Sequence, residues 1–232
     1  MFEKILVVIP ARGGSKEVPR KNMQPLGGYP LFVHSIRHAL SASIPPSNIL
    51  VSSDDEEILE TARPYEVICH RRPDAISGDL SSTEDCLVDA WEQRQDCDTV
   101  LSLQPTSPIR FSVKAFLNFY LDGDYDSALT VTKLYNFFWR ERPVCPETTS
   151  YYWSASYDLK NRMMRQEVGR EDFRYFDCGN MYMSNAKMLM KNRCRLGEEV
   201  GIFRISDIEG MQIDTHTDLD IFRQLAKGWK FS

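Results

Sequence analysis

KILVVIPARGGSKEVPRKN, residues 4–22, places an apolar segment directly before a basic, glycine-containing loop. Its first part, KILVVI (4–9), is rich in β-branched side chains and typical of a strand buried on both faces of a parallel sheet. The run stops at Pro10, and the loop that follows carries Arg12, Lys16, Arg20 and Lys21. Ligands of open α/β sheets bind beyond the carboxyl ends of the strands, so we expect this loop at a binding site.

The rest of the chain alternates predicted strands with predicted helices, which indicates right-handed βαβ units and an α/β fold. The strands are expected at 4–9, 48–53, 66–69, 98–103, 126–132, 179–184 and 200–205. The helices are expected at 30–42, 55–63, 83–94, 112–121, 186–191 and 215–227, the last with Asp214 or Thr215 as its N-cap. Residues 134–176, rich in aromatics and arginines, interrupt this order, and we interpret them as an insertion with an antiparallel hairpin.

Length, charge and cysteine spacing narrow the class of protein. A chain of 232 residues with 42% hydrophobic composition suits one globular domain, or one domain with a sizeable insertion. The net charge of −5 disfavours a nucleic-acid partner, while local basic clusters fit a small anionic substrate. No apolar stretch approaches the roughly 20 residues that span a membrane. The six cysteines lack CxxC spacing and no signal peptide is visible, so we expect free thiols in a cytoplasmic protein rather than zinc.

The loop after the first strand has the chemistry of a phosphate site. Gly13 and Gly14 can turn backbone N–H groups toward an anion. Arg12 offers a planar fork that matches phosphate oxygens, and Lys21 offers a compact charge. Several phosphates need several cations, so the loop favours a nucleoside triphosphate over the alternative of a solvated basic turn. It contains neither the P-loop pattern nor the dinucleotide GxGxxG.

Six segments in order resemble one enzyme family: IPARGGSKEVPRKN (9–22), VSSDDEEI (51–58), RRPDAISGDLSST (71–83), LQPTSPIR (103–110), GNMYM (179–183) and IDTHTDL (213–219). They resemble the cytidylyltransferases that activate sialic acids and related nine-carbon keto acids. This resemblance implies a Rossmann-like, GT-A-like nucleotidyltransferase fold, a three-layer sandwich with a mostly parallel sheet. It also implies a single domain over 1–232 with an inserted dimerisation and sugar-contact subdomain at 134–176. The implied partners are CTP, a sugar acid, Mg²⁺ and a second copy of the chain, with no nucleic acid or membrane.

In the implied reaction the anomeric hydroxyl of the sugar attacks the α-phosphate of CTP, and cations around the phosphates lower the barrier. By the resemblance, Arg12 and Lys21 are catalytic. The nucleotide site is predicted to contain Ala11, Arg12, Gly13, Ser15, Lys16, Lys21, Asn22, Arg72, Ser82 and Thr83. The sugar is predicted to contact Gln104, Arg140, Arg165 and Tyr182. Simpler roles stay open: solvation for Lys16, helix capping for Ser82 and Thr83, interface ion pairs for Arg140 and Arg165, and a structural role for Arg110.

The chain departs from the family pattern near its last helix. The family usually has two acidic residues two positions apart, whereas this chain has Gln212 and Asp214. We expect Mg²⁺ to be held by Asp214 and phosphates, with Gln212 offering an amide oxygen, unless Asp214 only caps the helix.

The cues for the sugar disagree. YFDCGNMYM (175–183) looks closer to pseudaminic-acid enzymes and LQPTSP (103–108) to the sialic and legionaminic branches. Cys178 is expected to be a buried small residue rather than a nucleophile. Two other functions stay open: the same fold with another base or sugar, such as a guanylyltransferase, and a catalytically weak nucleotide sensor or scaffold, which Gln212 suggests.

Overall fold

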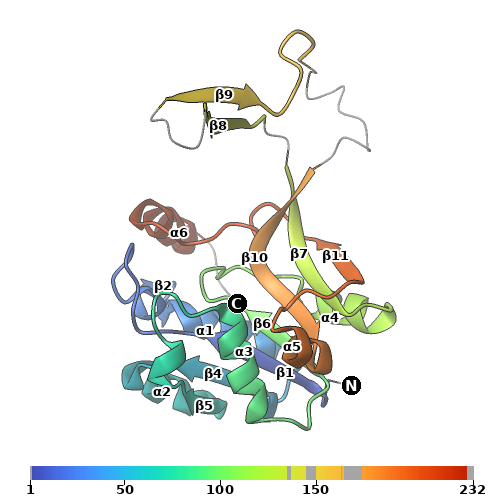
Figure 1. The fold of residues 1–232 in the computed structure, drawn as a ribbon. Coiled ribbons are helices and arrows are strands. Elements are labelled where there is room, and N and C mark those ends of the chain that lie inside the picture. The colour runs from blue at the N-terminus through green and yellow to red at the C-terminus, as the bar shows by residue number, and fades with distance from the viewer. Residues whose placement is uncertain (1, 135–136, 145–149, 163, 165–173, 229–232) are drawn as a thin grey trace. The chain divides into compact units, whose positions relative to one another are not determined.

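The computed structural model describes residues 2–134, 137–144, 150–162, 164 and 174–228 (Figure 1). The chain divides into two compact units. One comprises residues 1–132 and 177–232, and the other comprises residues 133–176.

A seven-stranded sheet forms the centre of the first unit. Its strands are β1 (Ile5–Pro10), β4 (Ile49–Ser53), β5 (Ile68–Arg71), β6 (Thr99–Leu103), β7 (Ser127–Leu134), β10 (Arg174–Asn185) and β11 (Val200–Arg204). They lie in the order β11-β7-β10-β6-β1-β4-β5. The pairs β1–β4, β1–β6, β4–β5 and β7–β11 are parallel, and β10 runs antiparallel to β6. The predicted α/β fold with a mostly parallel sheet is confirmed.

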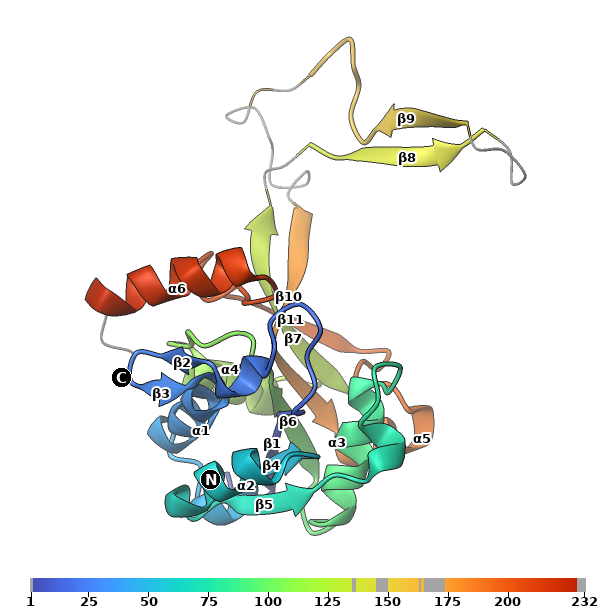
Figure 2. The ribbon, with the colours of Figure 1, turned by 90° about the vertical axis from the view of Figure 1, so that its left-hand side faces the viewer.

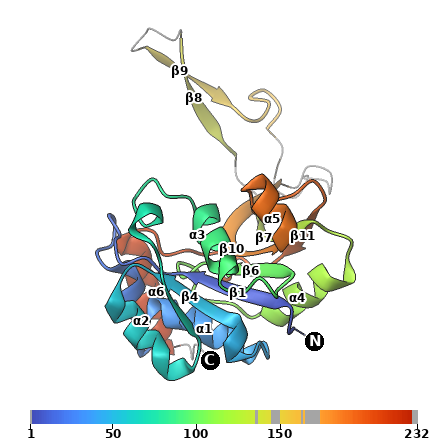
Figure 3. The ribbon, with the colours of Figure 1, turned by 60° about the horizontal axis from the view of Figure 1, so that its bottom comes forward.

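Helices cover both faces of this sheet. Within the described residues they are α1 (Leu31–Ser41), α2 (Glu56–Ala62), α3 (Thr83–Glu92), α4 (Val113–Asp122), α5 (Ala186–Asn192) and α6 (His216–Gly228). Helices α3 and α5 lie on one side of the sheet, and α1 and α2 lie on the other (Figure 3). The apolar run of β1 explains this, because Val7 packs with α1 and α4 while Leu6 packs with α3 and α5. In the described part of the chain no helix is both long and apolar enough to cross a bilayer.

Short elements were not expected from the sequence. In the part of the chain that the structure describes, four one-turn 3-10 helices are present, η1 (Lys21–Met23), η2 (Pro46–Asn48), η3 (Arg63–Tyr65) and η4 (Asp74–Ile76). Strands β2 (Pro25–Leu26) and β3 (Tyr29–Pro30) form a small hairpin between β1 and α1, near α6 (Figure 2). Two predicted strands also differ in position or length: β5 is shifted by two residues, to Ile68–Arg71 from 66–69, and β10 begins at Arg174 instead of residue 179.

The second unit contains a two-stranded antiparallel hairpin, as predicted. Strand β8 (Trp139–Pro143) pairs with β9 (Tyr151–Ala155), so that Trp139 lies opposite Ala155. Both strands expose large aromatic side chains, including Trp139, Tyr152 and Trp153. The dimerisation role of this segment stays a prediction.

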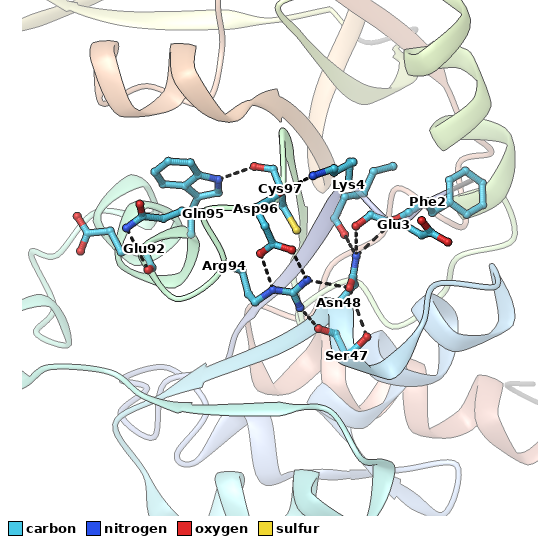
Figure 4. A network of polar contacts seen from close by, with 12 residues as sticks. Phe2, Glu3, Lys4, Ser47, Asn48, Glu92, Arg94, Gln95, Asp96 and Cys97 are labelled. Carbon is cyan, nitrogen blue, oxygen red and sulfur yellow. Dashed lines mark hydrogen bonds and ion pairs between the residues drawn. The ribbon is translucent and has the colours of Figure 1, made fainter.

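A polar network joins the amino-terminal ends of β1, β4 and β6 (Figure 4). The buried Asn48 donates from Nδ2 to the carbonyls of Glu3 at 2.8 Å and Ile5 at 3.0 Å. Arg94 donates from Nη2 to the side-chain oxygen of Asn48 at 3.2 Å and from Nε to Asp96 at 2.8 Å. This network therefore fixes the strand starts at the end of the sheet opposite to the predicted site.

Candidate active site

A cavity of about 310 Å³ lies beyond the carboxyl ends of β1, β5 and β6. Pro10 at the end of β1, Arg72 after β5 and Gln104 after β6 all line it. Because neighbouring parallel strands end at the same edge of the sheet, segments distant in sequence meet here. Of the residues predicted for the site, those that line the cavity are Arg12, Ser15, Lys21, Asn22, Arg72, Ser82, Thr83 and Gln104.

Each basic side chain of the first loop has a carboxylate partner from another segment. Arg12 Nη1 lies 3.2 Å from Asp79 Oδ1, and Lys16 Nζ lies 2.8 Å from Asp79 Oδ2. Arg20 pairs outside the cavity lining with Asp55 at 3.1 Å and Glu57 at 2.6 Å. The sequence predicted the cations but not their carboxylate partners. These partners come from residues 55–79 and from the segment before α6.

Lys21 is the most enclosed of these cations, with a side chain 14% exposed. Its Nζ donates to the carbonyl of Ile213 at 3.0 Å and lies 3.3 Å from Asp214 Oδ1. A lysine held in this way keeps its charge at a fixed point of the cavity wall, which is what a phosphate site requires.

Side chains behind the loop fix its backbone. Asn22 Nδ2 donates to the carbonyl of Arg12 at 2.7 Å, and the amide of Gly13 donates to Asp54 Oδ1 at 2.8 Å. The Gly13 N–H therefore faces a carboxylate, whereas we had expected it to face a bound anion. Gly13 has a steric role instead, because a Cβ there would lie 2.7 Å from the Cβ of Asp55. Ala11 is buried and lies behind the cavity wall.

A buried arginine and a helix start form the opposite wall. Arg72 is 5% exposed, and it donates from Nε to Ser52 Oγ at 3.0 Å and from Nη2 to the carbonyl of Ser52 at 2.7 Å. Ser82 is the N-cap of α3, since its Oγ accepts from the amide of Asp85 at 3.0 Å. Capping and cavity lining therefore coincide at Ser82, and the first residue of α3, Thr83, lies beside it.

Buried polar side chains hold the loop after β6 in place. Arg110 is 3% exposed and donates to the carbonyls of Gln104 and Asn180 and to Ser35 Oγ. Burial lowers the pKa of Arg110 to about 9. The ring of His38 lies 2.8 Å from the carbonyl of Pro108. These contacts favour a structural role for Arg110, and they fix the main chain of Gln104 at the cavity.

Other predicted residues lie outside the cavity lining. Tyr182 is buried on β10, where its hydroxyl donates to Asp177 at 2.7 Å and its ring lies under the guanidinium of Arg195. Met181 and Met183 take the opposite face of β10. Arg140 belongs to β8 of the second unit, and Arg165 lies outside the described residues. The sugar roles of these three residues stay predictions.

The described cysteines show no sign of catalysis. Cys69, Cys86, Cys97, Cys178 and Cys194 are free thiols. Cys178 is 1% exposed, and burial raises its pKa, which disfavours the reactive thiolate. This agrees with its expected role as a small buried residue.

The residues predicted for Mg²⁺ lie in the segment before α6. Gln212 and Asp214 flank the buried Ile213, and Gln212 Nε2 donates to Ser107 Oγ at 3.4 Å. The N-cap of α6 is Thr215, whose Oγ1 accepts from the amide of Asp218 at 3.2 Å, so the carboxylate of Asp214 is not used as the cap. One carboxylate and one amide oxygen fit a hydrated Mg²⁺ that takes its other ligands from phosphates and water. In the described ranges no cluster of three His, Cys, Asp or Glu side chains is suited to hold a metal ion.

An α/β sheet with a cation-lined cavity beyond its strand ends defines a nucleotide-binding enzyme class. A family model described as cytidylyltransferase matches residues 6–135, and the chain belongs to this family.

Two relatives and one solved structure are similar to this chain. It is 28% identical to the CMP-N,N'-diacetyllegionaminic acid synthase of Legionella pneumophila over 97% of both chains. It is 34% identical to N-acylneuraminate cytidylyltransferase A of Danio rerio over 59% of this chain, which spans 32% of the longer fish protein. A CMP:2-keto-3-deoxy-manno-octonic acid synthetase solved with CTP has the same fold, with a TM-score of 0.68 at 19% identity, over 97% of this chain and 99% of that chain.

Proposed function

We propose that this chain transfers CMP from CTP to the anomeric hydroxyl of a sialic-acid-like nonulosonic acid, giving a CMP-sugar and pyrophosphate. The observation that carries the proposal is the cavity at the strand ends, where Arg12, Lys21 and Arg72 converge in a member of the cytidylyltransferase family. The names of the bacterial and fish relatives support a nine-carbon sugar acid as the acceptor.

The proposed chemistry uses the fixed positive charges. The sugar oxygen forms a new bond to the α-phosphorus, the bond to the pyrophosphate oxygen breaks, and the hydroxyl proton passes to solvent water. Negative charge grows on the α-phosphate and the leaving group, and cations held in place beforehand stabilise that charge. Lys21, fixed by the carbonyl of Ile213, serves the α-phosphate, and Arg12 with Lys16 serves the leaving phosphates.

The remaining walls of the cavity take the base and the sugar. Arg72, Ser82 and Thr83 line one side, where a charged donor and hydroxyl groups can complement the acceptors and the amine of cytosine. Gln104 lies at the end of β6 with its main chain fixed by Arg110, and it serves as a sugar contact.

Mg²⁺, a homodimer and a cytoplasmic location belong to the same proposal. Asp214 and Gln212 would hold the metal, which when bound supplies positive charge to the phosphates. Exposed Trp139, Tyr152 and Trp153 on the hairpin support a contact with a second copy of the chain. The free thiols of the described residues support a reducing compartment.

The test is pyrophosphate release with Mg²⁺ and either CTP or GTP, against N-acetylneuraminate, a legionaminic acid, a pseudaminic acid and Kdo. We expect release with CTP and a nine-carbon acid. Arg12→Ala and Lys21→Ala should lower kcat/KM by about 100-fold or more, the usual effect of removing one charge-stabilising donor.

A matched control is Arg20→Ala, which removes a cation of the same loop that points away from the cavity and should change kcat/KM less than threefold. Near-normal turnover of Arg12→Ala and Lys21→Ala would show that the phosphate assignment is wrong. Tight CTP binding without release for any sugar acid would replace this proposal with the sensor function.

A further inference from the structure

Asp79 forms ion pairs with two cations of the first loop, Arg12 and Lys16. Its Oδ1 lies 3.2 Å from Arg12 Nη1 and its Oδ2 lies 2.8 Å from Lys16 Nζ. Arg12 Nη1 also donates to the carbonyl of Gly78 at 3.4 Å. One anionic group thus presents two oxygens to two cations, which is the pattern in which a phosphate group binds arginine and lysine.

We infer that Asp79 competes with phosphate groups for Arg12 and Lys16, and that it thereby weakens pyrophosphate binding and promotes pyrophosphate release. This inference rests on the proposed function. It makes Asp79 a residue that sets the affinity for the leaving group, a role that sequence reasoning did not assign to it.

The charge of Asp79 makes the competition unavoidable. The hydrogen bond from Lys16 holds the pKa of Asp79 below its usual range, so the side chain is an anion at neutral pH. A phosphate oxygen that approaches Arg12 and Lys16 meets this carboxylate at the same donors, and like charges at such short range repel. Phosphate binding therefore requires Asp79 to leave at least one of the two cations.

The local structure allows the side chain to move without disturbing the fold. Asp79 lies between η4 and α3, within a turn in which the amide of Ser81 donates to the carbonyl of Gly78 at 3.2 Å. The side chain of Asp79 is 47% exposed and the adjacent Leu80 is fully exposed. A change of side-chain rotamer is then sufficient, and the capped start of α3 at Ser82 stays in place.

The ion pair of Lys21 with Asp214 differs from the pairs of Asp79 in the function proposed for its carboxylate. Asp214 pairs with Lys21, but it is also the carboxylate predicted to hold Mg²⁺. Asp79 has no such second use in the proposed chemistry, and both of its oxygens face cations assigned to the leaving phosphates. Neutralising Asp79 should therefore strengthen phosphate binding, whereas neutralising Asp214 should weaken it.

The experiment measures the Kd of inorganic pyrophosphate and of CTP, each with and without Mg²⁺, by calorimetry on the full chain. A partly exposed ion pair shifts an equilibrium by about two- to fivefold, so losing both pairs in Asp79→Asn should tighten pyrophosphate binding about tenfold. Asp79→Glu, which keeps the charge, should stay within twofold of the native protein. Glu57→Gln, which removes a carboxylate from Arg20 outside the cavity, is the matched control and should also stay within twofold.

Adding Asp79→Asn to a variant that lacks both cations tests whether Asp79 acts through Arg12 and Lys16. If Asp79 acts through the two cations, Asp79→Asn should tighten pyrophosphate binding much less in an Arg12→Ala, Lys16→Ala background. Asp79→Ser repeats the test with a second neutral side chain, and circular dichroism verifies that each variant is folded.

Unchanged or weaker pyrophosphate binding by Asp79→Asn and Asp79→Ser would overturn the inference. Weaker binding only with Mg²⁺ would do so by placing Asp79 among the groups that hold the metal–phosphate complex. The readout needs no sugar acid, so tighter pyrophosphate binding without any turnover would support the inference while the proposed transfer reaction fails.

Discussion

His38 should make the protein lose stability in acid, through a contact that supports the cavity wall. The ring is 7% exposed, and its Nε2 lies 2.8 Å from the carbonyl of Pro108. A carbonyl only accepts, so Nε2 carries the proton, and it is burial that favours the neutral ring. Burial, and next the nearby charge of Arg110, lower the pKa of His38 from 6.5 to about 3.

The sign and size of the effect follow from these two pKa values. Between pH 6.5 and 3 the unfolded chain binds a proton at this position and the folded chain does not, so stability falls as the pH falls. From pH 7 to pH 5 His38 alone should lower the free energy of unfolding by about 2 kcal/mol.

The matched variant is His38→Gln, whose side-chain amide can still donate to Pro108 but does not titrate. Urea unfolding is followed by circular dichroism at 222 nm, because the helices of the described residues all lie in the first unit. The difference between the native protein and His38→Gln should shift by about 2 kcal/mol in favour of the variant from pH 7 to pH 5. Parallel curves for the native protein and His38→Gln would refute the reasoning.

Substitutions at three further positions, with one control, test other parts of the structure. Asn48→Ala leaves buried carbonyls of the strand starts without their donor and should lower the free energy of unfolding by about 2–3 kcal/mol, measured in urea. Gly13→Ala places a Cβ 2.7 Å from the Cβ of Asp55, so CTP binding should weaken by calorimetry, while Gly14→Ala, with nothing within 4 Å, should bind normally. Arg110→Lys keeps the charge but loses the planar fork, and it should destabilise the fold by about 1–3 kcal/mol and lower kcat/KM, because the main chain of Gln104 loses its fixed partner.

Most of the sheet was predictable because its core strands are short apolar runs between turns. β1, β4 and β6 are buried throughout or nearly so, and such runs carry their own signal. β10 was predicted too short because it begins with exposed residues from Arg174 onward, which have no apolar pattern. The small β2–β3 hairpin was missed because two residues per strand leave no periodicity to detect.

The members of the site were partly predictable, but their partners were not. The motif and its place after β1 identified Arg12 and Lys21, which line the cavity. The pairing of Arg12 with Asp79 joins residues far apart in sequence, and no local pattern encodes it. Tyr182 was assigned from its motif alone; its hydroxyl contacts Asp177 and it is not among the residues that line the cavity, so its sugar role stays a prediction. Asp79 lies inside the segment 71–83, but only Arg72, Ser82 and Thr83 of that segment were predicted to belong to the site.

The carboxylate partners of the first loop also bear on which polyanions the protein can attract. RNA and DNA bind through rows of accessible lysines and arginines whose counterions are released into solution. Here Arg12, Lys16, Arg20 and Lys21 already have protein carboxylates as counterions, and none of these is released. A long nucleic-acid strand therefore gains little at this surface, whereas a compact ligand that brings several charges into one cavity can replace the carboxylates one by one. A basic loop whose cations are already paired is thus a poor electrostatic match for a long nucleic-acid strand.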